Sequence, residues 1–169
     1  MLPTPLHPAV VHFPIVLATA LPVAALLALL AIRRGSEARR AWAIPLALAV
    51  ALSVSGWVAL ETGEAEEERV EAVVGDAPIH EHEQAAERFL VLAGVLTLVA
   101  GAGLLRGPTG AAARMVAGVG TLVVLAAAFQ VGRAGGELVY GQGAARAYER
   151  IAPGSPAGRI ESREAREHH

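Results

Sequence analysis

Four long apolar runs, separated by short polar segments, dominate the pattern of the chain. They cover about residues 9–32, 41–60, 85–105 and 115–132, and no charged residue falls between Arg40 and Glu61. A helix that crosses a bilayer needs about 20 apolar residues, and lipid forces such a segment to satisfy its backbone internally as a helix. The pattern predicts an all-α bundle of four transmembrane helices over residues 1–134, followed by an outer C-terminal segment over 135–169.

Composition supports this prediction and excludes several classes of function. Of the 169 residues, 54% are hydrophobic and 18% are charged, whereas soluble domains are about 45–50% apolar and 25% charged. The net charge of −2 argues against a nucleic-acid partner, which needs a concentrated positive surface. Without cysteine the chain has no disulfide, thiolate metal site or covalently attached haem. The sequence shows no nucleophile–base pair and no phosphate-binding loop, so nothing in it indicates a hydrolase or transferase.

The distribution of arginine predicts the orientation in the membrane. The short links 33–40 and 106–114 carry four and two arginines, whereas the central segment 61–83 carries nine acidic residues and one arginine. Because positively charged loops stay in the cytoplasm, both short links are expected inside. The N-terminus, the acidic segment and the C-terminus are then outside the cytoplasm.

Two outer segments carry patterns of their own. Val70, Val73 and Val74 have the spacing of a helix stripe, and Thr62 is a plausible N-cap, so a short amphipathic helix is expected over the outer face of the bundle. The glycine pair 135–136 is expected to act as a hinge, after which the C-terminal segment folds back over the same face. The last, Pro- and Gly-punctuated part is expected to be mobile.

Histidines carry the candidate chemistry. His7 and His12 lie at the outer end of the first span, and His80 and His82 lie at the outer end of the third. His12 is followed by an unbroken apolar run, and an ionisable side chain inside the membrane is a functional candidate by default. These four residues are therefore the candidate ligands.

Three interpretations of the histidine cluster remain open. In the first, a b-type haem is bound by one histidine from each span, with His12 and His82 as iron ligands. In the second, zinc or copper is bound with help from Glu81 or Glu83. In the third, the histidines are structural residues at the membrane surface. Trp57 lies at the same level and could line the site.

One arginine, the two tryptophans and a transport function are further candidates. Arg88 is a candidate partner for an acidic neighbour or a haem propionate, and the two tryptophans Trp42 and Trp57 are expected as interface anchors. A transporter is the alternative from another class, but no acid or base lies at mid-membrane depth, where a coupling site is expected. Its path would be lined by Ser53, Ser55, Thr97, Thr121 and Gln130.

The start of the chain, LHPAVVHFPIVL, resembles the signature HPxxVHFPI of a family of bacterial membrane proteins named for domain of unknown function 2231. The stretches SGWVALETGEAEEERVE, HEHEQAAERF and GGELVYGQG are also similar, so the resemblance covers residues 6 to about 144. It implies four spans in a bacterial inner membrane, with His7 and His12 as signature histidines and either His80 or His82 as the third. Relatives joined to cytochrome c or Rieske modules favour electron transfer.

Together these observations predict a membrane-embedded b-type haem protein that transfers electrons near the outer face. Its acidic outer segment is expected to attract a basic soluble electron carrier, and a membrane redox complex is the alternative partner. A scaffold or metal-binding module without haem, and a homo-oligomer, remain open.

Overall fold

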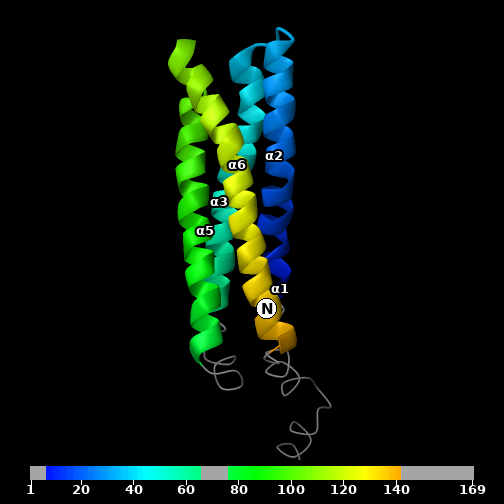
Figure 1. Cartoon of the computed structure of the whole chain (residues 1–169), viewed down its shortest axis with the longest axis vertical. Helices are drawn as coiled ribbons and strands as arrows, with labels where there is room; N and C mark the ends of the chain where they lie inside the picture. The colour runs from blue at the N-terminus through cyan, green and yellow to red at the C-terminus, as the bar shows by residue number, and fades with distance from the viewer. Residues whose placement is uncertain (1–6, 66–75, 142–169) are drawn as a thin grey trace, which may run out of the picture.

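The computed structural model describes residues 7–65 and 76–141, and all of its regular elements are helices (Figure 1). Four long apolar helices run side by side, so the all-α bundle is confirmed, and each is long and apolar enough to cross a membrane. The last helix continues into a π-helical turn. The elements are α1 (His7–Val10), α2 (His12–Arg33), α3 (Ala38–Glu64), α5 (Asp76–Ala102), α6 (Gly107–Gly136) and η1 (Glu137–Gly141).

Helices α3, α5 and α6 are longer than the apolar runs on which they were predicted. Thr62 lies inside α3 and donates to the carbonyl oxygens of Val58 and Ala59, so it is not an N-cap. The predicted hinge at 135–136 is also wrong, because α6 runs through Gly136 and continues as η1. The amphipathic helix expected around Val70–Val74 and the chain beyond Gly141 lie outside the described residues.

A short interruption at Val11 separates α1 from α2. Pro14 has no N–H and cannot bond the carbonyl of Val10, four residues earlier. The bond from Ile15 N to Val11 O is long, at 3.4 Å. The first turn of the chain, which begins with His7, is therefore a separate element at the end of the bundle.

The four long helices form a ring. Helix α2 packs against α3 and α6, and α5 packs against the same two helices. Consequently α2 and α5 occupy opposite corners, and α3 and α6 occupy the other two. Side chains from α2 and α5 can meet only across the axis of the bundle.

Buried residues follow each helix at alternating steps of three and four, which is the spacing of a heptad repeat. In α2 they are Pro14, Ala18, Leu21, Ala25 and Ala28. Most are small, whereas large side chains such as Phe13 and Leu27 are exposed. Lipid is as apolar as leucine, so small residues mark the inside of a membrane bundle because they let helices approach closely.

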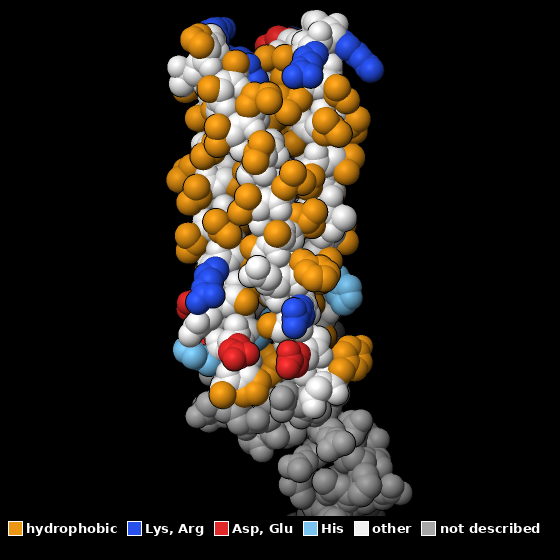
Figure 2. Space-filling model, in the orientation of Figure 1, with side chains coloured by type: hydrophobic (Ala, Val, Ile, Leu, Met, Phe, Trp, Pro, Cys, Tyr) orange, Lys and Arg blue, Asp and Glu red, His pale blue; other side chains and the backbone are white. Residues whose placement is uncertain are grey.

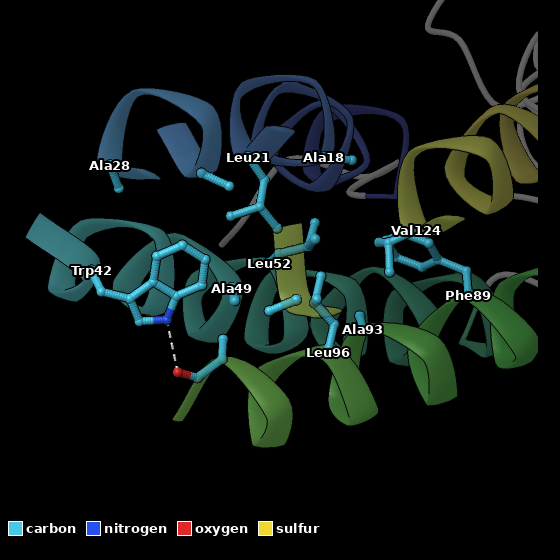
Figure 3. Packing of buried hydrophobic residues seen from close by; sticks show 13 residues of the cluster. Ala18, Leu21, Ala28, Trp42, Ala49, Leu52, Phe89, Ala93, Leu96 and Val124 are labelled. Atoms are coloured by element: carbon cyan, nitrogen blue, oxygen red, sulfur yellow. Dashed lines mark hydrogen bonds between the residues drawn. The ribbon is translucent and has the colours of Figure 1, made fainter. Parts of the chain in front are cut away.

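Every seventh residue contributes to one layer of the core, and the layers combine large with small side chains. In one layer, a Cβ on Gly56 would lie 3.1 Å from Cε1 of Phe89. In another, Trp42 of α3 contacts Gly103 beyond α5, and its Nε1 donates to the Ala100 carbonyl at 2.9 Å (Figure 3). Trp42 is 1% exposed, so the expectation that it anchors the membrane interface is wrong.

The bundle has two chemically distinct ends. We call the end formed by the α2–α3 and α5–α6 connections the arginine end, and the opposite end, with α1 and η1, the histidine end (Figure 1). Figure 2 shows an apolar middle with charged side chains gathered at both ends. Acidic and basic side chains lie together at the histidine end of this face.

Candidate functional site

The inward stripes of α3, α5 and α6, and the stripe of α2 continued through α1, reach the histidine end and share one layer there. Seven-residue steps lead from Pro14 to His7 and from Phe89 to His82. The corresponding steps in α3 and α6 lead to Gly63 and Gly135. We call His7, Gly63, His82 and Gly135 the histidine layer. It places two imidazoles on opposite corners of the ring and two glycines on the others.

His7 lies directly on the backbone of α3. Its Nδ1 is 2.9 Å from the Ala59 carbonyl oxygen and 3.4 Å from Oγ1 of Thr62. A carbonyl only accepts hydrogen bonds, so Nδ1 carries the proton and the lone pair of the neutral ring is on Nε2. A Cβ on Gly63 would lie 3.1 Å from Cε1 of His7. Glycine is therefore what permits this close approach.

His82 lies on α6 in the same manner. A Cβ on Gly135 would lie 3.1 Å from its Cε1, and the imidazole has a hydrogen bond with the backbone of Val131. Its Nδ1 is buried and has no hydrogen-bond partner within the described part of the chain. A buried polar atom without a partner costs about 1–3 kcal/mol. Such an atom is a candidate for binding a group from outside the protein.

The two imidazoles make a T-shaped contact across the axis. Their ring centroids are 6.4 Å apart and the ring planes are nearly perpendicular, at 87°. A metal atom between two imidazoles, with metal–nitrogen distances of about 2.0–2.1 Å as for zinc, separates the ring centres by roughly 6 Å. The centroid distance between His7 and His82 is close to this value, and the two rings form a T-shaped contact.

The other two candidate histidines are not part of this pair. His12 is exposed on the outside of α2, so it does not point toward His82. His80 is also exposed, and it lies off the inward stripe of α5. Its Nε2 accepts a hydrogen bond from Gln84 at 2.9 Å, and its Nδ1 is 3.8 Å from a carboxylate oxygen of Glu83.

The remaining candidates lie on the surface. Trp57 is 55% exposed and does not line the space between the histidines. Arg88 donates to Oε1 of Gln84 at 3.1 Å, so its hydrogen bond goes to an amide of its own helix. Within residues 7–65 and 76–141, no group of three or more His, Asp or Glu side chains is arranged to hold a metal ion.

Sequence reasoning did not identify Gly63 and Gly135 as parts of the site. Both glycines lie in the inward stripes, seven residues from Gly56 and Ala128 respectively. The same register places His7 and His82 inside and leaves His12 and His80 outside. Heptad register, read from the small residues, was the signal that could have selected the correct pair.

The charges differ between the two ends. Described arginines at the arginine end include Arg33, Arg34, Arg39, Arg40 and Arg106, all exposed. Described acidic residues at the histidine end are Glu61, Glu64, Glu81, Glu83, Glu87 and Glu137. The histidine layer therefore lies at the acidic end of the molecule.

Comparison with known proteins gives one positive finding. The model of the family described as "Predicted membrane protein (DUF2231)" matches residues 3–147, which include the whole described bundle and the histidine layer. No curated protein and no solved structure matches the chain. The family match and the four apolar helices identify a multi-pass membrane protein, which has the lipid bilayer as its surroundings.

Proposed function

We propose that this chain, which belongs to the DUF2231 family of predicted membrane proteins, is a b-type haem protein that transfers electrons. His7 and His82 are the axial ligands of the iron. The observation that carries the proposal is the pair of imidazoles on opposite corners of the bundle, 6.4 Å apart. The exposed side chain of His12 makes it the weaker candidate of the two signature histidines.

The number of ligands favours haem iron over zinc. Haem iron receives its equatorial nitrogens from the porphyrin and needs only axial ligands from the protein. Two imidazoles from facing helices supply both. Zinc takes four protein ligands in structural sites and three in catalytic sites. A non-covalent haem also agrees with a chain that has no cysteine.

The hydrogen bonds of the two rings and the glycines beneath them support the same assignment. Nδ1 of His82 is buried without a partner among the described residues, and the Nδ1 hydrogen bond of His7 to Ala59 leaves the lone pair of that ring on Nε2. Gly63 and Gly135 allow the two rings to lie directly on α3 and α6, which fixes their positions in this layer.

The charges indicate an orientation and a partner. With the arginine end in the cytoplasm, the histidine layer lies near the outer face. The bound haem supplies one-electron chemistry there. The carboxylates at this end (Glu61, Glu64, Glu81, Glu83, Glu87 and Glu137) favour a basic soluble electron carrier. Its association rate falls as salt screens these charges.

An absorption spectrum tests the proposal. The protein is purified in mild detergent after expression with ample haem, and spectra are recorded oxidised and after reduction with dithionite. We expect α and β bands in the reduced protein. Absence of these bands would overturn the assignment of haem.

The four histidines provide matched variants for the ligands. His7→Ala and His82→Ala are expected to lose most of the bound haem, and His12→Ala and His80→Ala to keep it. Addition of free imidazole to His82→Gly is expected to restore the bands, which a variant that failed to fold could not do. Normal haem content in both His7→Ala and His82→Ala would show that the ligands are elsewhere.

A single zinc or copper ion bound by the same two nitrogens is the second candidate, because the 6.4 Å spacing is close to the value for one metal atom, with or without a porphyrin. Elemental analysis of the same purified protein separates the two. About one equivalent of zinc or copper, without α and β bands, would support the ion. The loss of that metal in His82→Ala would assign it to the histidine layer.

A further inference from the structure

A groove opens between α5 and α6 at the histidine end, outside the bundle core. Its volume is about 450 Å³. It is lined by Ala77, Pro78, Glu81, Gln130, Arg133, Ala134, Glu137 and Leu138. Figure 2 shows acidic and basic side chains next to each other in this part of the surface.

Within residues 7–65 and 76–141, the charged side chains of the groove form no ion pair with one another. Arg133, Glu81 and Glu137 are all exposed. In the described ranges, no ion pair within 4.0 Å joins Arg133 to either carboxylate; the two pairs present involve Arg40 and His80. The groove therefore offers one guanidinium and two carboxylates to a ligand, above an apolar floor of Ala77, Pro78, Ala134 and Leu138.

The groove lies where a membrane helix meets the lipid headgroups. Arg133 is the first charged residue after the uncharged run that follows Arg114, and Glu81 precedes the apolar run of α5. On the membrane side of the groove, exposed apolar residues of α6, such as Phe129 and Val123, provide a surface for acyl chains. A ligand with a charged head and an apolar tail fits both regions.

We propose that this groove binds a zwitterionic phospholipid that carries a primary ammonium, such as phosphatidylethanolamine. Arg133 binds the phosphate, since guanidinium groups match phosphate geometry with paired hydrogen bonds. Glu81 and Glu137 accept hydrogen bonds from the ammonium. Phosphatidylcholine has the same charges but no N–H to donate, and phosphatidylglycerol has only the negative charge. The site is independent of the proposed haem.

Competition among lipids tests the proposal. The full chain is reconstituted in vesicles with equal parts of phosphatidylethanolamine, phosphatidylcholine and phosphatidylglycerol, extracted in mild detergent, and examined by native mass spectrometry. We expect phosphatidylethanolamine to be retained about tenfold more than either competitor, the ratio that one good charge-assisted hydrogen bond gives. The double variant Glu81→Gln/Glu137→Gln is expected to bring the three lipids to within about twofold of each other, whereas Arg133→Gln is expected to lower the retention of all three about tenfold because each carries a phosphate.

Two substitutions at the same end serve as controls. Arg88 and Glu87 are exposed on α5 but do not line the groove, so Arg88→Gln and Glu87→Gln should keep the preference. Equal retention of the three lipids by the wild type, a preference for phosphatidylglycerol, or wild-type lipid retention in Arg133→Gln would overturn the proposal. A dimer mass without bound lipid would also overturn it, because a second copy would then fill the groove.

Discussion

At both ends of the bundle, large side chains pack on glycine. The two ends differ in whether the buried polar atoms of these side chains have hydrogen-bond partners. At the arginine end, Trp42 lies on Gly103, and its Nε1 donates to the Ala100 carbonyl at 2.9 Å. Arg114 is buried there and donates to the Gly103 carbonyl. Both buried donors are thus bonded to backbone carbonyls at the end of α5, where a cation also interacts favourably with the helix dipole.

At the histidine end, two imidazoles lie on two glycines in a layer of the same register. His7 is bonded to the Ala59 carbonyl, but Nδ1 of His82 has no partner within the described residues. The comparison shows that close packing on glycine can accompany bonded donors at one end and, within the described residues, a buried ring nitrogen without a partner at the other. The histidine layer is therefore the candidate for chemistry, and the layer of Trp42 is structural.

The largest effect on stability is expected at the arginine end. In Gly103→Ala the added Cβ would lie 2.8 Å from Cδ1 of Trp42 and 2.9 Å from the backbone oxygen of Ala100. Such overpacking is expected to lower the unfolding free energy by about 3 kcal/mol. Denaturant unfolding in detergent, followed by circular dichroism, measures this change.

Gly101→Ala is the control for that substitution. Nothing lies within 4 Å of a Cβ at Gly101, and alanine is favoured over glycine inside a helix by about 0.5–1 kcal/mol. We therefore expect unchanged or slightly higher stability. Equal losses in Gly101→Ala and Gly103→Ala would contradict the packing of Trp42 on Gly103.

A smaller effect is expected from the hydrogen bond of Trp42 alone. Trp42→Phe removes the Nε1 donor, but the Ala100 carbonyl still accepts a bond from Gly103 N at 3.0 Å. We expect a loss of about 1 kcal/mol in the free energy of unfolding. Trp57→Phe should change stability by less than about 0.5 kcal/mol, because Trp57 is 55% exposed. A greater loss from Trp57→Phe would show that the exposed tryptophan is the structural one.

Much of the fold could be predicted from the sequence because hydropathy marks membrane helices directly. Each of the four apolar runs corresponds to a long helix, and the errors are at the ends: polar residues such as Thr62 continue α3 beyond the apolar part, whereas α2 begins three residues later than predicted. The register of the helices was harder to predict. Lipid and bundle interior are both apolar, so the apolar sequence around His12 could not show that this side chain points outward.

The sequence predicted at which end of the bundle the candidate site lies, but not which histidines form it. Arginine counts located all four histidines at one end, where the structure also places them. Which of them meet depends on the side of the helix they occupy, and that information lies in the small residues of the stripes, such as Ala18 and Ala25 in α2. The pairing of His7 with His82 required three-dimensional contacts between helices on opposite corners.

Glycine-to-alanine substitutions at the histidine end should change stability least. In Gly63→Ala and Gly135→Ala the new Cβ lies 3.1 Å from Cε1 of His7 and His82, so each ring must move by a few tenths of an ångström. The higher helix propensity of alanine offsets the crowding, and the free energy of unfolding should stay within about 1 kcal/mol of wild type.

If these rings hold the haem iron, a change in their support should instead weaken haem binding about tenfold. Haem titration of the apoprotein measures this, with Gly132→Ala as control because a Cβ there has no neighbour within 4 Å. Wild-type haem affinity in both variants would show that the glycines do not position the ligands, whereas a large loss of stability would make the histidine end a structural layer like that of Trp42.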